Sequence, residues 1–243
     1  MKQSKIIIFA LTVICSGIFV SCSTFLGNGI TGNGHVITKD VKIAPFDELD
    51  IDGVFNIVLK QGTKESVVIE ADENIAKLIQ VKSENNVLSV NYKDEVNIRK
   101  STKLNVYITV VNITDIDLNI VGDVSVNNIL TQHSLYIDYN GVGDVDLNLN
   151  CDNLIFENSS VGDITLSGFV NKFDLDNSGV GDVFAQNLKS KIAIIDNSGV
   201  GDVKVFASES INVESSGVGD VFYSGNPKST DVNDSSVGDI IEK

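Results

Sequence analysis

Apolar and polar residues alternate in short stretches that recur through the second half of the chain. In each unit, two apolar positions spaced two apart precede a Val-Gly-Asp phrase, and two more follow it. The preceding pairs are Leu135/Ile137, Leu154/Phe156, Phe173/Leu175, Ala193/Ile195 and Ile211/Val213. The following pairs are Val145/Leu147, Ile164/Leu166, Val183/Ala185, Val203/Val205 and Val221/Tyr223. A spacing of two is the period of a strand with one buried face, so each unit predicts two or three short strands.

The Val-Gly-Asp phrase, followed by Val or Ile, sets the length of the repeat. Its aspartates are Asp123, Asp144, Asp163, Asp182, Asp202, Asp220 and Asp239, and they lie 21, 19, 19, 20, 18 and 19 residues apart. Its valine recurs at Val142, Val161, Val180, Val200 and Val218. No unit can bury its apolar face alone, so we expect the units to stack. At about 3.3 Å per residue, such a unit has a perimeter of about 60 Å, which suits a flattened or triangular β-helix coil.

The first half of the chain is strand-rich but less regular. Strands are predicted at 48–51, 54–59, 67–71, 87–92 and 104–110, with turns at Gly53 and Gly62 and one helical turn over 72–77. We interpret residues 34–110 as irregular coils and a cap of the same solenoid, and residues 111–243 as its regular coils. The fold class is therefore all-β, with residues 34–243 forming one domain.

The N-terminal segment has the features of a secretion signal. Two lysines precede an apolar run from Ile6 to Val20, which is short for a membrane span and suitable for a signal peptide. The run ends in Phe-Val-Ser-Cys, which resembles a bacterial lipobox. We therefore predict a lipoprotein signal over residues 1–21, lipidation at Cys22 and a flexible tether over 22–33. The alternative is an ordinary secretory signal followed by an incidental cysteine.

Charge restricts the classes of partner. The chain has a formal net charge of −15, and removal of residues 1–21 leaves 16 Lys+Arg against 33 Asp+Glu, or −17. This balance disfavours nucleic acid and electrostatic attraction to anionic lipid headgroups. A lipid-anchored protein with Ser23 and Thr24 after its acylated cysteine is expected at the outer membrane, and the sequence leaves its periplasmic or surface face open. Cys151 would then have no disulfide partner, and we interpret it as a small buried apolar residue.

The repeated Gly-x-Gly-Asp phrase has two interpretations. Glycine accepts positive φ at a sharp corner, and Asn158, Asn177 and Asn197 could stack there and bond the neighbouring backbone. The seven repeated aspartates would also form a column about 29 Å long if the coils are about 4.8 Å apart. Such a column could hold Ca²⁺, which prefers oxygen ligands. Turn chemistry is the favoured interpretation, and a cation ladder is the alternative.

Residues typical of catalysis do not cluster in the sequence. His35 and His133 are isolated, and neither a Gly-x-Ser-x-Gly elbow nor a phosphate-binding loop is present. Aromatic side chains that could stack on sugars are Tyr136, Tyr139, Phe222 and Tyr223, and the alternative for some of them is a core or strand-edge position. The prediction is a non-enzyme that needs no cofactor apart from the possible Ca²⁺.

The sequence resembles the auto-transporter adhesin, head GIN domain family of secreted bacterial proteins. The resemblance lies in Phe46-Asp47-Glu48-Leu49, in the run from Ile51 to Gly62, in Val67 to Ile75, in Val87 to Val90 and in the later Ser-Gly-x-Gly-Asp repeats. It covers residues 34–243. It implies a right-handed, single-stranded β-helix in the cell envelope, whereas the adhesin name gives only an indication of function.

Three functions follow as hypotheses. The first is a lipid-anchored, non-catalytic envelope module for binding or adhesion, with a glycan or an envelope protein as partner. The second is a polysaccharide-active enzyme of the β-helix type, which predicts a local acidic and basic cluster in a groove. The third is a structural envelope spacer without a ligand.

Overall fold

The computed structural model describes residues 29–94 and 96–243, which are almost entirely β-structure. The strands are β1 (Ile30–Thr31), β2 (Val36–Val41), β3 (Glu48–Val54), β4 (Asn56–Gln61), β5 (Ser66–Asp72), β6 (Ile79–Glu84), β7 (Val87–Tyr92), β8 (Ile98–Lys100), β9 (Leu104–Val110), β10 (Asp115–Val121), β11 (Val124–Val126), β12 (Leu130–Val142), β13 (Val145–Asn158), β14 (Ile164–Asn177), β15 (Val183–Asn197), β16 (Val203–Ser215), β17 (Val221–Ser224), β18 (Ser229–Asp234) and β19 (Ile240–Glu242). One short helix, α2 (Glu73–Ala76), is described and is too short to cross a bilayer.

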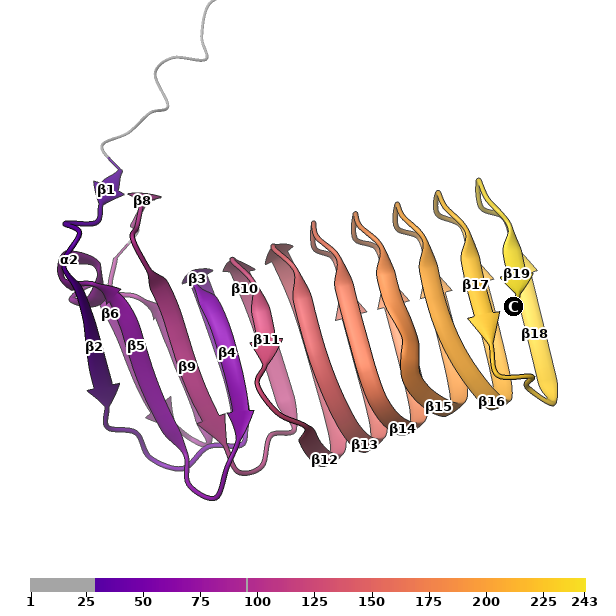
Figure 1. Ribbon diagram of the computed structural model, residues 1–243, viewed down its shortest axis with the longest axis horizontal. Helices are drawn as coiled ribbons and strands as arrows, with labels where there is room; N and C mark the ends of the chain where they lie inside the picture. The colour runs from indigo at the N-terminus through magenta and orange to yellow at the C-terminus, as the bar shows by residue number, and fades with distance from the viewer. Residues whose placement is uncertain (1–28, 95) are drawn as a thin grey trace, which may run out of the picture.

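The predicted solenoid is confirmed, with about seven turns of stacked parallel coils. Figure 1 shows the coils of β10 to β19 following one another along the long axis, with their narrow corners aligned on one edge. From β12 to β16 each coil holds one continuous curved strand of 13 to 15 residues rather than two or three short ones. The strands are long because each coil pairs in parallel with the next coil almost without interruption. This pairing continues through the bend that lies opposite the narrow corner of the coil.

The core fills the interior of this flattened tube along its length. The ten apolar pairs that flank the Val-Gly-Asp phrases are all buried. Each inward position stacks on its equivalent in the next coil, as in Leu135, Leu154 and Phe173. One buried cluster extends from Phe46 to Tyr223, so both halves of the chain share a single core.

The first half begins the solenoid with one coil, then leaves the stack. Strands β3 and β4 form a coil that pairs in parallel with β10 and β11, which are 67 residues later in the chain. The intervening segment lies on the other side of this coil, where β7 pairs with β3 and β9 pairs with β4. Strands of the first half therefore contribute to the solenoid, but they do not stack in the order of the sequence.

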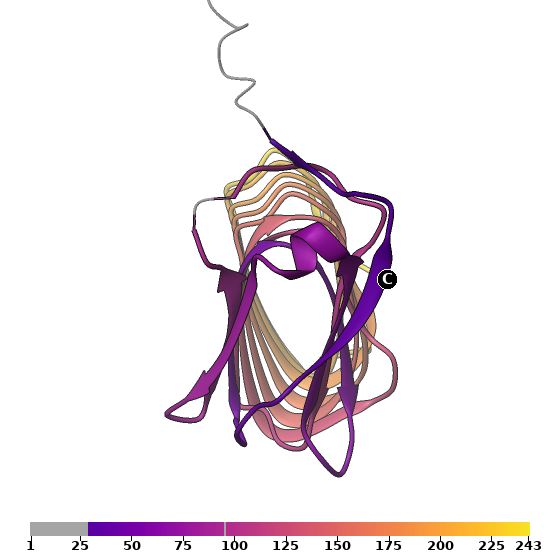
Figure 2. The same ribbon diagram turned by 90° about the vertical axis from the view of Figure 1, so that its left-hand side faces the viewer.

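Antiparallel strands close the N-terminal end of the tube. β5 pairs antiparallel with β9 and β2, and β6 pairs antiparallel with β7. The predicted helical turn is confirmed as α2, which lies across this end in Figure 2. Asp72, immediately before α2, is fully buried and accepts hydrogen bonds from the Thr102 amide (2.6 Å) and the Gly34 amide (2.8 Å). These bonds connect three separate segments of the cap.

Candidate binding surfaces along the solenoid

The corner of each coil is the most regular feature of the molecule, and glycine makes it possible. Gly181 has φ 141°, and its equivalents in five neighbouring coils have φ between 129° and 147°. A Cβ on Gly181 would lie 2.1 Å from the Gly162 carbonyl oxygen of the preceding coil. Only glycine permits both the dihedral angle and this close approach of two backbones. The backbone at the corner is therefore closely similar from coil to coil.

Buried asparagines stack just before the corner, as the sequence predicted. The Nδ2 of Asn158 donates to Oδ1 of Asn177 at 2.7 Å, and Asn177 donates in the same way to Asn197 at 2.7 Å. All three side chains are at most 5% exposed. Each buried amide thus finds its partner in the adjacent coil, which keeps the coils in register.

The predicted aspartate column exists, and its carboxylates have partners within the chain. The backbone N–H of Asp163 donates to Oδ1 of Asp144 at 2.9 Å, and that of Asp182 donates to Oδ1 of Asp163 at 2.9 Å. The same bond recurs at Asp144, Asp202, Asp220 and Asp239 at 2.8 to 3.1 Å. Asn56 begins the series by accepting from the Asp123 amide. The favoured interpretation as turn chemistry therefore has a direct structural basis.

The same column has no metal-site geometry in the described part of the chain. Among residues 29–94 and 96–243, no group of three or more His, Cys, Asp or Glu side chains is placed to hold a metal ion. A ladder that shares Ca²⁺ between successive coils stays a prediction, and it requires a thermal-stability test.

The valine of each corner projects outward, away from the core. Val142, Val161, Val180, Val200 and Val218 are 47 to 50% exposed, and Val121 and Val237 extend the row to seven. Their backbones pair from coil to coil as isolated parallel bridges. We call this row the valine ridge. It lies two residues before the aspartate column, so an apolar row and an acidic row run side by side.

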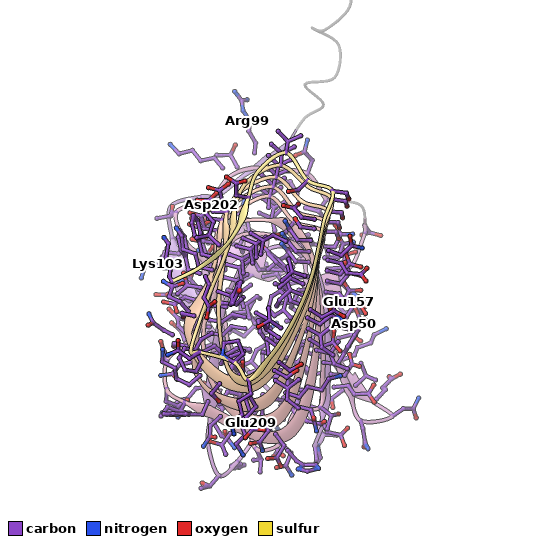
Figure 3. The ribbon with its side chains drawn as sticks, turned by 90° about the vertical axis from the view of Figure 1, so that its right-hand side faces the viewer. Asp50, Arg99, Lys103, Glu157, Asp202 and Glu209 are labelled. Atoms are coloured by element: carbon purple, nitrogen blue, oxygen red, sulfur yellow. The ribbon has the colours of Figure 1, made fainter. Side chains whose placement is uncertain are left out.

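A second acidic row, which the sequence analysis missed, covers one flat side of the tube. In-register pairing aligns Asp50, Asp117, Asp138, Glu157, Asp176, Asp196 and Glu214 on consecutive strands. Figure 3 shows Asp50 and Glu157 on the same side, with Lys103 on the other. Because these acids recur at the same intervals as the corner aspartates, alignment of the repeats could have revealed them. We call this row the acidic face.

Crowding on the acidic face changes proton affinity. Partial burial, followed by the charge of Asp138, raises the pKa of Asp117. Partial burial and the charge of Asp196 likewise raise the pKa of Asp176. Each of these carboxylates is therefore easier to protonate in the folded chain than an isolated aspartate.

The other flat side carries aromatic and basic side chains. Lys204 lies over the rings of Phe184 (4.9 Å) and Phe222 (5.8 Å), and Lys243 lies 3.7 Å from the Phe222 ring centre. Of the aromatics considered for sugar stacking, Tyr139 and Tyr223 are buried in the core. Tyr136 and Phe222 are half-buried and partly accessible.

The histidines and the described cysteine occupy the positions expected of structural residues. His35 and His133 are both exposed, and each has a carboxylate neighbour: Glu73 at 3.4 Å and Asp152 at 2.7 Å. Cys151 is buried, as predicted, and burial raises the pKa of its thiol to about 11. Its thiol is therefore protonated at neutral pH. Cys22, the predicted lipidation site, lies outside the described residues.

Similar structures are known from Bacteroides and Parabacteroides species. A putative adhesin from Bacteroides fragilis has 34% sequence identity and a TM-score of 0.85, and the alignment covers 88% of this chain and 100% of the other. A putative lipid binding protein from Parabacteroides distasonis has 19% identity and a TM-score of 0.69, with 87% and 99% of the two chains covered. A putative adhesin from Parabacteroides merdae has 19% identity and a TM-score of 0.58, with 88% and 100% covered. The last two establish similarity of fold alone.

The family comparison agrees with these structures. A comparison with curated proteins found no match. The model of the family described as "Putative auto-transporter adhesin, head GIN domain" matches residues 45–227, which contain the first coil, the detour into the cap and most of the regular coils. This chain therefore belongs to the auto-transporter adhesin, head GIN domain family.

Proposed function

We propose that this protein is a lipid-anchored, non-catalytic binding module of the bacterial cell envelope. The observation that carries the proposal is the valine ridge beside the aspartate column. Exposed apolar residues scattered singly are ordinary, but a continuous exposed apolar row suggests a contact surface. Seven coils at a spacing of about 4.8 Å make this surface about 29 Å long.

The shape and charge of this surface suit an extended partner. The ridge is convex in section and repeats one pattern, so it offers the same contact several times along its length. The neighbouring carboxylates favour a partner that combines apolar and basic groups over one with an acidic surface. The adhesin names of the family and of the Bacteroides fragilis structure support a role in attachment.

Lipidation at Cys22 would place this surface at the outer membrane. Each buried methylene contributes about 0.8 kcal/mol, so the several acyl chains of a bacterial lipoprotein bind firmly. The Cys22→Ser variant is expected to lose incorporation of labelled fatty acid and to leave the membrane fraction. The Cys151→Ser variant is the matched control and should keep both properties. A labelled Cys22→Ser protein would contradict the anchor.

Binding is tested with the full chain and isolated envelope fractions in a pull-down measurement. The triple variant Val161→Thr, Val180→Thr, Val200→Thr keeps β-branched side chains at the corners but makes the ridge polar. It should bind several-fold less material than the unmodified chain. Ile155→Thr, which alters an exposed apolar residue on the acidic face, is the control and should bind normally.

Two results would contradict the proposal. Equal binding by the triple variant and the unmodified chain would remove the ridge as a contact surface. Release of new reducing ends from polysaccharide by the purified chain would contradict the non-catalytic role.

A further inference from the structure

A groove crosses several coils at the bend opposite the corners. It has a volume of about 410 Å³ and is formed by residues of β12 to β16. Its floor follows one row of stacked positions, Cys151, Val170 and Ser190, which are 2 to 7% exposed. Glu209, labelled at the bend in Figure 3, comes directly after the groove residue Ser208. The groove therefore runs along the long axis, perpendicular to the strands.

An exposed aromatic ring forms one wall of the groove. Phe169 is 66% exposed. Among the large apolar side chains that the structure describes as exposed, it is the one aromatic residue. It follows Gly168, which has φ 112°. A Cβ added at this glycine would lie 1.9 Å from the Leu149 carbonyl oxygen. The backbone at this glycine holds Phe169 in an outward-facing position, between Asn150 and Lys189 in the register of the sheet.

A second aromatic ring lies further along the same groove. The Nζ of Lys189 is 4.1 Å from the centre of the Phe206 ring and donates to the Gln186 carbonyl oxygen at 2.8 Å. This lysine is therefore held over the ring by two contacts. Phe169 and Phe206 give the groove two apolar ring surfaces on different coils.

The opposite wall is polar and already ordered. Asp152 accepts a hydrogen bond from Asn171 Nδ2 at 2.5 Å, and its other oxygen lies 2.7 Å from His133 Nδ1. Lys191 continues this wall in the next coil. Amide, carboxylate and ammonium groups thus offer both donors and acceptors along the groove, and the bond between Asn171 and Asp152 orders part of this wall before binding.

We propose that this groove binds a neutral oligosaccharide chain, with Phe169 as its principal stacking residue. A sugar ring has an apolar C–H face, which packs on an aromatic ring, and an edge of hydroxyls, which needs alternating donors and acceptors. The groove supplies both requirements on opposite walls. Its open, shallow course along several coils suits a linear chain rather than an enclosed small molecule. The high negative charge of the whole molecule favours a neutral chain over an acidic one.

Other ligand classes fit these walls less well. An extended peptide would add to a free strand edge, whereas the groove lies on strands whose backbones pair with each other. A lipid chain would place its methylene groups against the polar wall of Asp152 and Asn171 and would gain no hydrogen bond there. The inference rests on the proposed binding function and names a ligand class and a second surface for it.

The experiment measures affinity of the full chain in mild detergent for linear gluco-, manno- and galacto-oligosaccharides by calorimetry. We expect at least one neutral series to bind, with affinity that increases with chain length. Phe169→Ala should lower that affinity about tenfold or more, and Asn171→Ala should lower it several-fold. Phe222→Ala removes another ring paired with lysine outside the groove, so it should bind like the unmodified chain.

Three outcomes would overturn the proposal. They are no binding of any neutral series, binding of oligouronides alone, or equal affinity of Phe169→Ala and the unmodified chain. Envelope pull-down with Phe169→Ala separates the two proposals. If that variant retains full envelope binding while no oligosaccharide binds, the groove proposal fails and the valine ridge proposal stands.

Discussion

At the scale of single residues, the buried asparagines show how one side chain serves two coils. Asn177 donates to Asn197 and accepts from Asn158, so its removal leaves a donor and an acceptor buried without partners. A buried group without its hydrogen bond costs about 1–3 kcal/mol. The consequence of one truncation therefore extends over three coils.

We expect Asn177→Ala to lower the free energy of unfolding by about 3 kcal/mol, because two buried partners lose their bonds. Chemical denaturation of the full chain measures the difference. Asn187→Ala, at an exposed position in β15, is the control and should change stability by less than about 0.5 kcal/mol. Equal losses for both variants would contradict a structural role of the asparagine stack.

Asp72 gives a prediction for pH. The amide of Thr102, despite the opposing effect of burial, holds the pKa of this carboxyl below its ordinary value of 3.8. A lowered pKa in the folded chain means that its stabilising effect is complete above the ordinary pKa and is lost as pH falls through the lowered value. Asp72→Asn should therefore reduce stability by about 2 kcal/mol at pH 7 and by progressively less below pH 3.8.

Thermal melts across this pH range test the Asp72 prediction. Asp231→Asn, at an exposed position on β18, is the matched control and should show no such pH-dependent loss. A difference at pH 7 that persists unchanged in acid would show that shape, rather than charge, explains the role of Asp72.

At the scale of elements, the corner is the unit that every coil shares. Gly181 has a positive φ, and a Cβ added to it would lie 2.1 Å from the Gly162 carbonyl oxygen. Gly181→Ala should therefore lower the free energy of unfolding by about 3 kcal/mol through strain and displacement of the adjacent coil. Val180→Ala changes an exposed side chain at the same corner and should have a small effect. Equal stability of the two variants by chemical denaturation would contradict this account.

Removing a charge from the acidic face should change stability with pH in the opposite direction to removing the charge of Asp72. Because the pKa of Asp176 is raised, the folded chain is penalised above that value and relieved as pH falls through it. Asp176→Asn should increase the melting temperature at pH 7 and give no increase once the pH is well below the raised pKa. Asp146→Asn, on the opposite flat side, is the control for a general effect of net charge. A decrease in melting temperature at pH 7 would contradict this prediction.

The sequence predicts the strands and the core well, because inward positions follow a period of two and recur with each repeat. It does not indicate the valine ridge, where the glycine after each valine changes the backbone direction and the apolar side chain points outward. The acidic face follows the same repeat intervals as the Val-Gly-Asp phrase, but its residues are Asp in some coils and Glu in others and form no fixed phrase of their own. The groove could not be predicted, because it depends on where register shifts, such as that between Thr165 and Ser167, fall in adjacent coils.

At the scale of the whole molecule, the order of stacking is the part that sequence pattern cannot supply. β3 and β4 pair with strands 67 residues away, and they share no repeated phrase with them. The antiparallel cap likewise depends on long-range contacts such as those of Asp72. Where the sequence repeats, it predicts which coil pairs with which. Where the repeat ends, the sequence no longer predicts the pairing.

The aspartate column gives a prediction for metal removal. Since each carboxylate already accepts a backbone N–H from the next coil, we expect Ca²⁺ or a chelator to change the melting temperature of the full chain by no more than about 1 °C. Mg²⁺ serves as the control for general screening of charge. A chelator-induced fall of several degrees that Ca²⁺ alone restores would establish the cation ladder instead.

The identical corners have a consequence for the reach of the molecule. Because each corner presents the same backbone to its neighbours, one whole repeat can be gained or lost without changing the joint on either side. Each such event would lengthen or shorten the protein by about 4.8 Å and add or remove one step of each surface row. The length of the solenoid can thus be adjusted in uniform steps, as on a ruler.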